Sequence, residues 1–148
     1  MKTIGLKLSE NKLYPSISGF SRINIKTADD HPGAGSNGNL YLEVCDTNDS
    51  NSCCKQTFDG NFEEVGAENI FAFNAEFQKC LESSQKLYYF MGIITGPDTG
   101  PDGWKSDVIK IYFDGLTEEV CTLDGGKWLD GPGEVGQTRR PLKCQGWS

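Results

Sequence analysis

The sequence predicts an all-β protein, a β-sandwich stapled by disulfides. Short segments in which polar and apolar residues alternate recur along the chain, as in strands with one buried face. Turn-forming residues separate these segments, with 18 glycines and 6 prolines in the chain. The cysteines number six, an even set that is typical of a disulfide framework. At 148 residues the chain fits a single domain that buries its own core.

About seven or eight strands are expected, a number typical of a sandwich. The clearest alternation lies in 106–113, where Val108, Lys110 and Tyr112 face one side and Ile109, Ile111 and Phe113 face the other. Aromatic and β-branched residues fill 87–95, which is therefore expected in the centre of its sheet. The other expected strands are 21–27, 40–45, 56–58, 69–73 and 118–123. A weak helical pattern covers 75–84.

The two ends of the chain lack a clear period. Residues 1–20 are expected to form an N-terminal arm or a first edge strand, and residues 131–148 a glycine-containing C-terminal arm. The sandwich itself is expected within 21–130.

The cysteines are expected to brace the fold. They are Cys45, Cys53, Cys54, Cys80, Cys121 and Cys144. Structural zinc sites use paired ligands a few residues apart, whereas Cys53 and Cys54 are adjacent and could hardly both reach one tetrahedral ion. A bond from Cys121 to Cys144 would clip the C-terminal arm to the last strand. Cys45 and Cys80 are each expected to take one of the adjacent pair, in an order that the sequence leaves open.

Disulfides predict a secreted, extracellular protein. The start of the chain, 1–6, lacks the apolar run of a signal peptide, so secretion implies that a signal has been removed. Asn48-Asp49-Ser50 is a glycosylation sequon that is compatible with export. No apolar run reaches transmembrane length. The net charge of −7 argues against nucleic acid, and against docking on anionic lipid without a cation.

The sequence shows no active site, and we expect a protein that is not an enzyme. Its single histidine, His31, lies among loop residues, and no G-x-S-x-G elbow or phosphate-binding loop is present. A triad built on His31 stays open as an alternative, in a small secreted enzyme.

Two acidic, glycine-rich loops are better candidates for a site. Loop 28–39 carries Asp29, Asp30 and Asn37, and loop 96–103 carries Asp98 and Asp102. Calcium takes about six to eight oxygen ligands on flexible backbone, and loops at the same end of a sandwich converge. The same residues are also what turns are made of, so calcium stays an expectation.

The tryptophans leave two interpretations open. Trp104 follows a turn and precedes a strand, so it is either a core residue or an exposed contact beside Lys105. Trp128 and Trp147 lie in the glycine-rich C-terminal region. Exposed tryptophan is typical both of sugar-stacking sites and of membrane-interface anchors.

Two segments resemble PLAT (lipoxygenase-homology) domains. Gly35-Ser36-Asn37-Gly38-Asn39-Leu40-Tyr41-Leu42 matches the family's glycine, polar residue and strand pattern. Gly103-Trp104, followed by Val108-Ile109-Lys110-Ile111-Tyr112, is similar to the plant embryo-specific branch. The resemblance covers about 21–130, and Lys105 stands where the family has an aromatic residue.

The resemblance implies a sandwich of two four-stranded antiparallel sheets without catalytic residues. Family members bind membranes or protein partners, some through calcium. Carried over to this chain, the ligands would be Asp29, Gly35, Asn37 and Asp102.

The expected function is therefore a secreted binding module, with a toxin or defence protein among its possible roles. It would dock on a lipid surface or a protein partner through loops 28–39 and 96–104, with Trp104 and Lys105 as contacts and calcium as a possible aid. The alternative is a lectin-like sandwich that binds a glycan through exposed aromatic residues.

Overall fold

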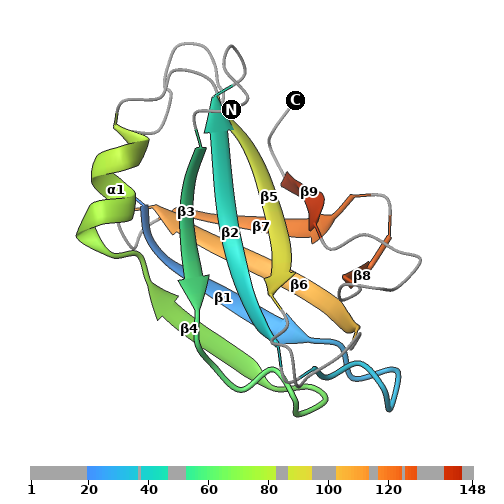
Figure 1. Cartoon of the computed structure of the whole chain (residues 1–148). Helices are drawn as coiled ribbons and strands as arrows, with labels where there is room; N and C mark the ends of the chain where they lie inside the picture. Colours follow the sequence, from blue (N-terminus) through green and yellow to red (C-terminus); the bar gives the residue numbers. More distant parts are fainter. Residues whose placement is uncertain are drawn as a thin grey trace.

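The computed structural model describes residues 20–36, 38–46, 53–82, 87–94, 103–113, 117–124, 126–129 and 139–144 (Figure 1). The strands are β1 (Phe20–Thr27), β2 (Asn39–Asp46), β3 (Cys53–Phe58), β4 (Glu68–Ala72), β5 (Leu87–Ile94), β6 (Trp104–Phe113), β7 (Thr117–Leu123), β8 (Trp128–Leu129) and β9 (Arg139–Cys144). One helix, α1 (Ala75–Leu81), lies between β4 and β5 in the described chain.

The strands form two antiparallel layers. One layer has the order β3-β2-β5-β9 and the other has the order β7-β6-β1-β4. Figure 1 shows β3, β2 and β5 side by side in front of β1, β6 and β7. The predicted sandwich of two four-stranded sheets is confirmed. The layers are also joined along one side, because β9 pairs with β5 at Phe90↔Pro141 and with β7 at Cys121↔Cys144.

The core fills the space between the layers, as strand alternation requires. Its innermost side chains come from both layers: Ile23 and Ile25 of β1, Leu40, Leu42 and Val44 of β2, Met91 of β5, and Ile109 and Ile111 of β6. The predicted alternation of 106–113 is confirmed, with Ile109 and Ile111 on the side that faces the core. The side chain of Phe113 lies outside the described residues.

The C-terminal strand was not predicted. Residues 139–144 were expected in an arm, whereas they form β9. The sequence of β9 does not look like a strand. It contains Pro141, which cannot donate a hydrogen bond to a ladder, and three basic residues, and its only buried side chains are Leu142 and Cys144. The two-residue β8 was missed for want of any repeating pattern.

The helix α1 confirms the first part of the weak pattern in 75–84. Asn74 caps it by accepting a hydrogen bond from the Phe77 amide, at 2.7 Å. Phe77 and Leu81 are buried against the core. Because the apolar positions are so few, the helix depends on its cap and on packing more than on its own propensity.

All six cysteines are paired as expected. The bonds are Cys45–Cys53, Cys54–Cys80 and Cys121–Cys144. The first and third link residues that lie directly opposite each other in the ladders of β2 with β3 and of β7 with β9. The second ties α1 to β3.

Candidate functional site

The loop after β1 is fastened to the start of β6. The Ala28 amide donates to the Lys105 carbonyl at 3.0 Å, and the Lys105 amide donates to the Ala34 carbonyl at 2.9 Å. Ser36 binds the other neighbouring loop, because its amide donates to the Phe62 carbonyl at 2.8 Å. The described part of this loop, 28–36, is therefore held on two sides.

Gly35 has a packing role in this loop. A Cβ atom built on Gly35 would lie 1.9 Å from the carbonyl oxygen of Glu63. No real side chain tolerates that distance, so the two backbones can approach only because residue 35 is glycine.

Trp104 belongs to the core. Its side chain is fully buried, and its indole Nε1–H donates to Thr27 Oγ1 at 2.8 Å. Its ring meets Phe62 edge to face, with centroids 6.4 Å apart. The prediction that Trp104 is an exposed contact is wrong for this structure, because a ring without accessible surface cannot touch a partner.

Lys105 points the other way, as alternation along β6 requires. Its Nζ donates to both carboxylate oxygens of Asp30, at 3.0 and 3.1 Å. The hydrogen bond from Lys105 lowers the pKa of Asp30 below its ordinary value. Lys105 Nζ also lies 5.9 Å from the ring centroid of Trp128.

Strand β8 places Trp128 next to Lys105. The pairing of β8 with β6 sets Trp128 opposite Lys105. The half-buried indole of Trp128 meets the ring of His31 edge to face, with centroids 5.1 Å apart. We call Asp30, His31, Lys105 and Trp128 the end cluster. The sequence predicted that loop 28–39 and Lys105 lie at one end of the sandwich, but it could not add Trp128, because β8 carries no detectable pattern.

The predicted calcium ligands are only partly described. Asp29 and Asp30 are both exposed at this end of the sandwich. Asp29 Oδ2 lies 4.0 Å from Lys26 Nζ, and Asp30 is held by Lys105. Gly35 lies in the same loop, whereas Asn37, Asp98 and Asp102 lie outside the described residues. Of the predicted ligand carboxylates, the structure thus describes those of two adjacent residues, each beside a different lysine.

The contacts of His31 orient its ring. The Gly33 amide donates to His31 Nδ1 at 2.9 Å, and the ring edge rests on Trp128. Nδ1 acts as the acceptor, so a neutral imidazole carries its proton on Nε2. The hydrogen bond to Gly33 and the contact with Trp128 both hold the loop after β1 in place.

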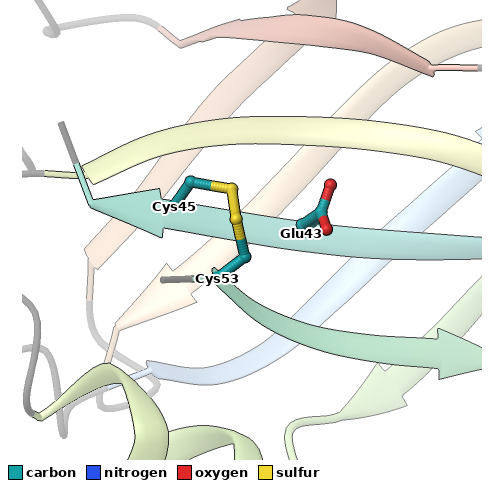
Figure 2. Close-up of side chains that lie close together, drawn as sticks. All are labelled: Glu43, Cys45 and Cys53. Atoms are coloured by element: carbon teal, nitrogen blue, oxygen red, sulfur yellow. A yellow bond between two sulfur atoms is a disulfide. The ribbon is translucent and has the colours of Figure 1, made fainter. Parts of the chain in front are cut away.

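Glu43, Cys45 and Cys53 form the only group of three potential metal ligands in the described residues (Figure 2). The two sulfurs are bonded to each other, so neither is a thiolate. Glu43 is already paired with Arg139. The group therefore lacks the donors that a metal site needs.

The comparisons with known proteins show the fold. No family model matches the sequence, and no curated protein matches it. The alpha toxin of Clostridium absonum is similar in structure, with a TM-score of 0.57 and 18% identity over 90% of this chain and 33% of the toxin. An alpha-toxin of Clostridium perfringens from an avian strain has a TM-score of 0.58 and 16% identity, covering 88% of this chain and 34% of the toxin.

The chain thus spans about a third of the length of these toxins. Identities this low establish a shared β-sandwich and leave activity open. The structural likeness agrees with the β-sandwich fold that the sequence predicted. No helix among the described residues has the length and apolar character needed to cross a membrane.

Proposed function

We propose that this protein is a secreted, non-catalytic binding module of PLAT type, which docks on a lipid surface or a protein partner through one end of its sandwich. We assign to the docking end the end cluster together with loops 28–39 and 96–103. The observation that carries the proposal is that an amphipathic indole, a lysine and a carboxylate lie together in the end cluster. Strand pairing and backbone hydrogen bonds hold the segments that carry them.

The chemistry of this end favours a lipid surface as the first partner to test. An indole whose ring is partly exposed is the residue type that anchors proteins at the membrane–water interface. Lys127 is exposed beside Trp128, and its ammonium could meet a lipid phosphate. The loop bonds to Lys105 reduce the entropy lost on binding, because the contact residues are already ordered.

Calcium is a proposed aid at the same end. Asp29, Asp30 and the backbone at Gly35 would supply oxygens, together with Asn37, Asp98 and Asp102. Lys105 competes with the ion, because its ammonium occupies both oxygens of Asp30. Binding of calcium at Asp30 therefore requires Lys105 to withdraw.

Co-sedimentation with vesicles tests the proposal. Vesicles of phosphatidylcholine alone and of phosphatidylcholine with phosphatidylserine are mixed with the protein, in calcium and in a chelator. We expect the wild type to sediment with at least one composition, and Trp128→Ala to lose most of this binding. The matched control is Ile70→Ala on β4, where the side chain is 62% exposed. Equal loss in the two variants would contradict docking through the end cluster.

Lys105→Met tests the calcium part. Removing the ammonium frees Asp30, so calcium should bind this variant about threefold more tightly than the wild type. The melting temperature measured against calcium concentration reports the difference, because a bound ion stabilises the folded state. The double variant that adds Asp30→Asn should lose the gain. Identical titrations of Lys105→Met and the wild type would rule out Asp30 as a ligand.

A further inference from the structure

The outer face of the β3-β2-β5-β9 layer carries a second set of contact residues, away from the end cluster. Strand alternation turns these side chains out of the core, because the described neighbours in each strand face inward and all but Gln56 and Arg140 are buried. They are Tyr41 of β2, Lys55 of β3, Tyr88 and Phe90 of β5, and Arg139 and Lys143 of β9, of which Lys143 lies on the part of β9 that pairs with β7. We call these six residues the aromatic–basic face.

The charge of this face is opposite to that of the whole protein. The chain carries a net charge of −7. The aromatic–basic face has three cations, and Glu43 is the one acid that the described parts of these four strands turn toward the same side. Such an excess of positive charge on an acidic protein marks a surface that fits an anionic partner.

Two of the three cations, Lys55 and Arg139, are held against aromatic rings. Lys55 Nζ lies 4.2 Å from the centroid of the Tyr41 ring, and Arg139 Cζ lies 4.1 Å from the centroid of the Phe90 ring. Cation–π contacts of this kind fix long side chains that would otherwise sample many rotamers. Arg139 also pairs with Glu43 through one of its nitrogens, which leaves the other donors of the guanidinium for a ligand.

A glycine in the neighbouring strand, β5, makes room for the Tyr41 ring. Gly92 of β5 lies opposite Tyr41 of β2. A Cβ atom on residue 92 would lie 2.1 Å from Cζ of Tyr41, so the Tyr41 ring lies over the glycine. Lys55, whose Nζ contacts this ring, is exposed to solvent. Tyr88, at 57% exposure, extends the aromatic surface along β5.

We propose that the aromatic–basic face binds an acidic polysaccharide, one whose sugar units carry carboxylate or sulfate groups. The C–H faces of such sugars would pack on Tyr88 and Phe90, and their anionic groups would pair with Lys55, Arg139 and Lys143. The planar guanidinium of Arg139 matches carboxylate and sulfate geometry.

A polysaccharide fits this face better than an acidic protein does. Glu43 lies opposite both Lys55 and Phe90 in the ladders and pairs with Arg139, so charged side chains stand beside the rings, whereas the centre of a stable protein interface is apolar and poor in charge. The rings lie on the two middle strands of this layer, β2 and β5, and the cations lie on the flanking strands, β3 and β9, with neighbouring strands about 4.8 Å apart. That arrangement suits a polymer in which every unit offers both an apolar face and an anion.

Binding to defined polymers tests the proposal. Dextran sulfate and polygalacturonate are the anionic probes, neutral dextran is the uncharged one, and polyglutamate stands for an acidic peptide. Calorimetry on the full chain should show binding to at least one anionic polysaccharide, little to dextran, and weaker binding to polyglutamate. Lys55→Gln and Arg139→Gln should each weaken the binding by about threefold or more.

The opposite layer supplies a matched control. Arg22 lies over the Tyr112 ring, with its Cζ 4.0 Å from the centroid, on the outer face of β1 and β6. Arg22→Gln therefore removes the same charge and the same type of contact from another surface, and should change the affinity less than twofold. An equal loss in Arg22→Gln would overturn the proposal, as would tighter binding to polyglutamate or no binding to either anionic polysaccharide. Trp128→Ala should keep its polysaccharide affinity, which separates this surface from the end cluster.

Discussion

At the start of β6, two neighbouring residues point in opposite directions. Trp104 lies wholly in the core and donates a hydrogen bond to Thr27, whereas Lys105 reaches the surface and binds Asp30. Both were predicted as contacts, since a turn comes just before them and the sequence does not say where alternation begins. The bulge between β1 and β6 near Thr27 also shifts the register, so the pattern of 106–113 could not be extended backwards to Trp104.

The buried position of Trp104 predicts a large effect on stability. Trp104→Ala should lower the free energy of unfolding by about 3 to 5 kcal/mol, because it empties a large core volume. Thr27→Val should cost about 1 to 3 kcal/mol, since it leaves the indole N–H buried without its acceptor. Chemical denaturation measures both values. A Trp104→Ala protein as stable as the wild type would show that the indole is not a core residue.

At the scale of elements, alternation in the sequence was a good guide wherever a strand buries several apolar side chains. Strands β2, β5 and β6 have such rows, and each was predicted within a few residues, as were β1 and β7, whose described side chains include two buried apolar ones each. β9 was not, because its position depends on pairing with two distant strands and on the bond from Cys144 to Cys121. Long-range pairing leaves little trace in a local pattern.

The disulfides should contribute unequally to stability. The Cys54–Cys80 bond closes a sequence separation of 26 residues, and Cys45–Cys53 closes one of 8. Because loop-closure entropy grows with length, the longer bond should contribute about 3.5 kcal/mol and the shorter one about 2.5 kcal/mol.

Replacing both cysteines of one bond with alanine measures each contribution. Chemical denaturation of the two double variants should show the larger loss for Cys54→Ala with Cys80→Ala. That variant should also lose helix signal first on heating, since its bond ties α1 to β3. A larger loss for the Cys45 and Cys53 pair would show that chain entropy does not set the order.

At the scale of the whole molecule, the two layers are linked on both sides, and the end cluster and the aromatic–basic face are separate surfaces. β9 closes one side between the layers, and Gln56 links the other by donating to the Ala72 carbonyl at 3.1 Å. The end cluster comes from the loop after β1, from the start of β6 and from β8, whereas the aromatic–basic face comes from side chains along β2, β3, β5 and β9. Composition predicted the acidic loops. It could not predict the aromatic–basic face, because its three cations come from β3 and the unpredicted β9.

Global stability should fall in alkaline solution because of Tyr89. This side chain is 3% exposed between the layers, and burial raises its pKa well above the ordinary value of 10.0, with the charge of Glu119 as a second cause. The folded state therefore keeps the phenol proton after the unfolded chain has released it. The stabilisation is complete below pH 10 and is lost as pH rises from there toward the folded pKa, by at most about 1.4 kcal/mol per pH unit.

Urea denaturation from pH 8 to pH 11 measures this slope, and Tyr89→Phe should flatten it because phenylalanine has no proton to release. Tyr41 and Tyr112 also have a raised pKa, from burial and from the hydrogen bond to Glu118 respectively. Both are partly exposed, so a smaller slope should remain in the variant. Recovery of the wild-type signal on return to neutral pH, without free thiols, shows that the disulfides stay intact. An unchanged slope in Tyr89→Phe would mean that another group, and not the tyrosine between the layers, governs the alkaline loss of stability.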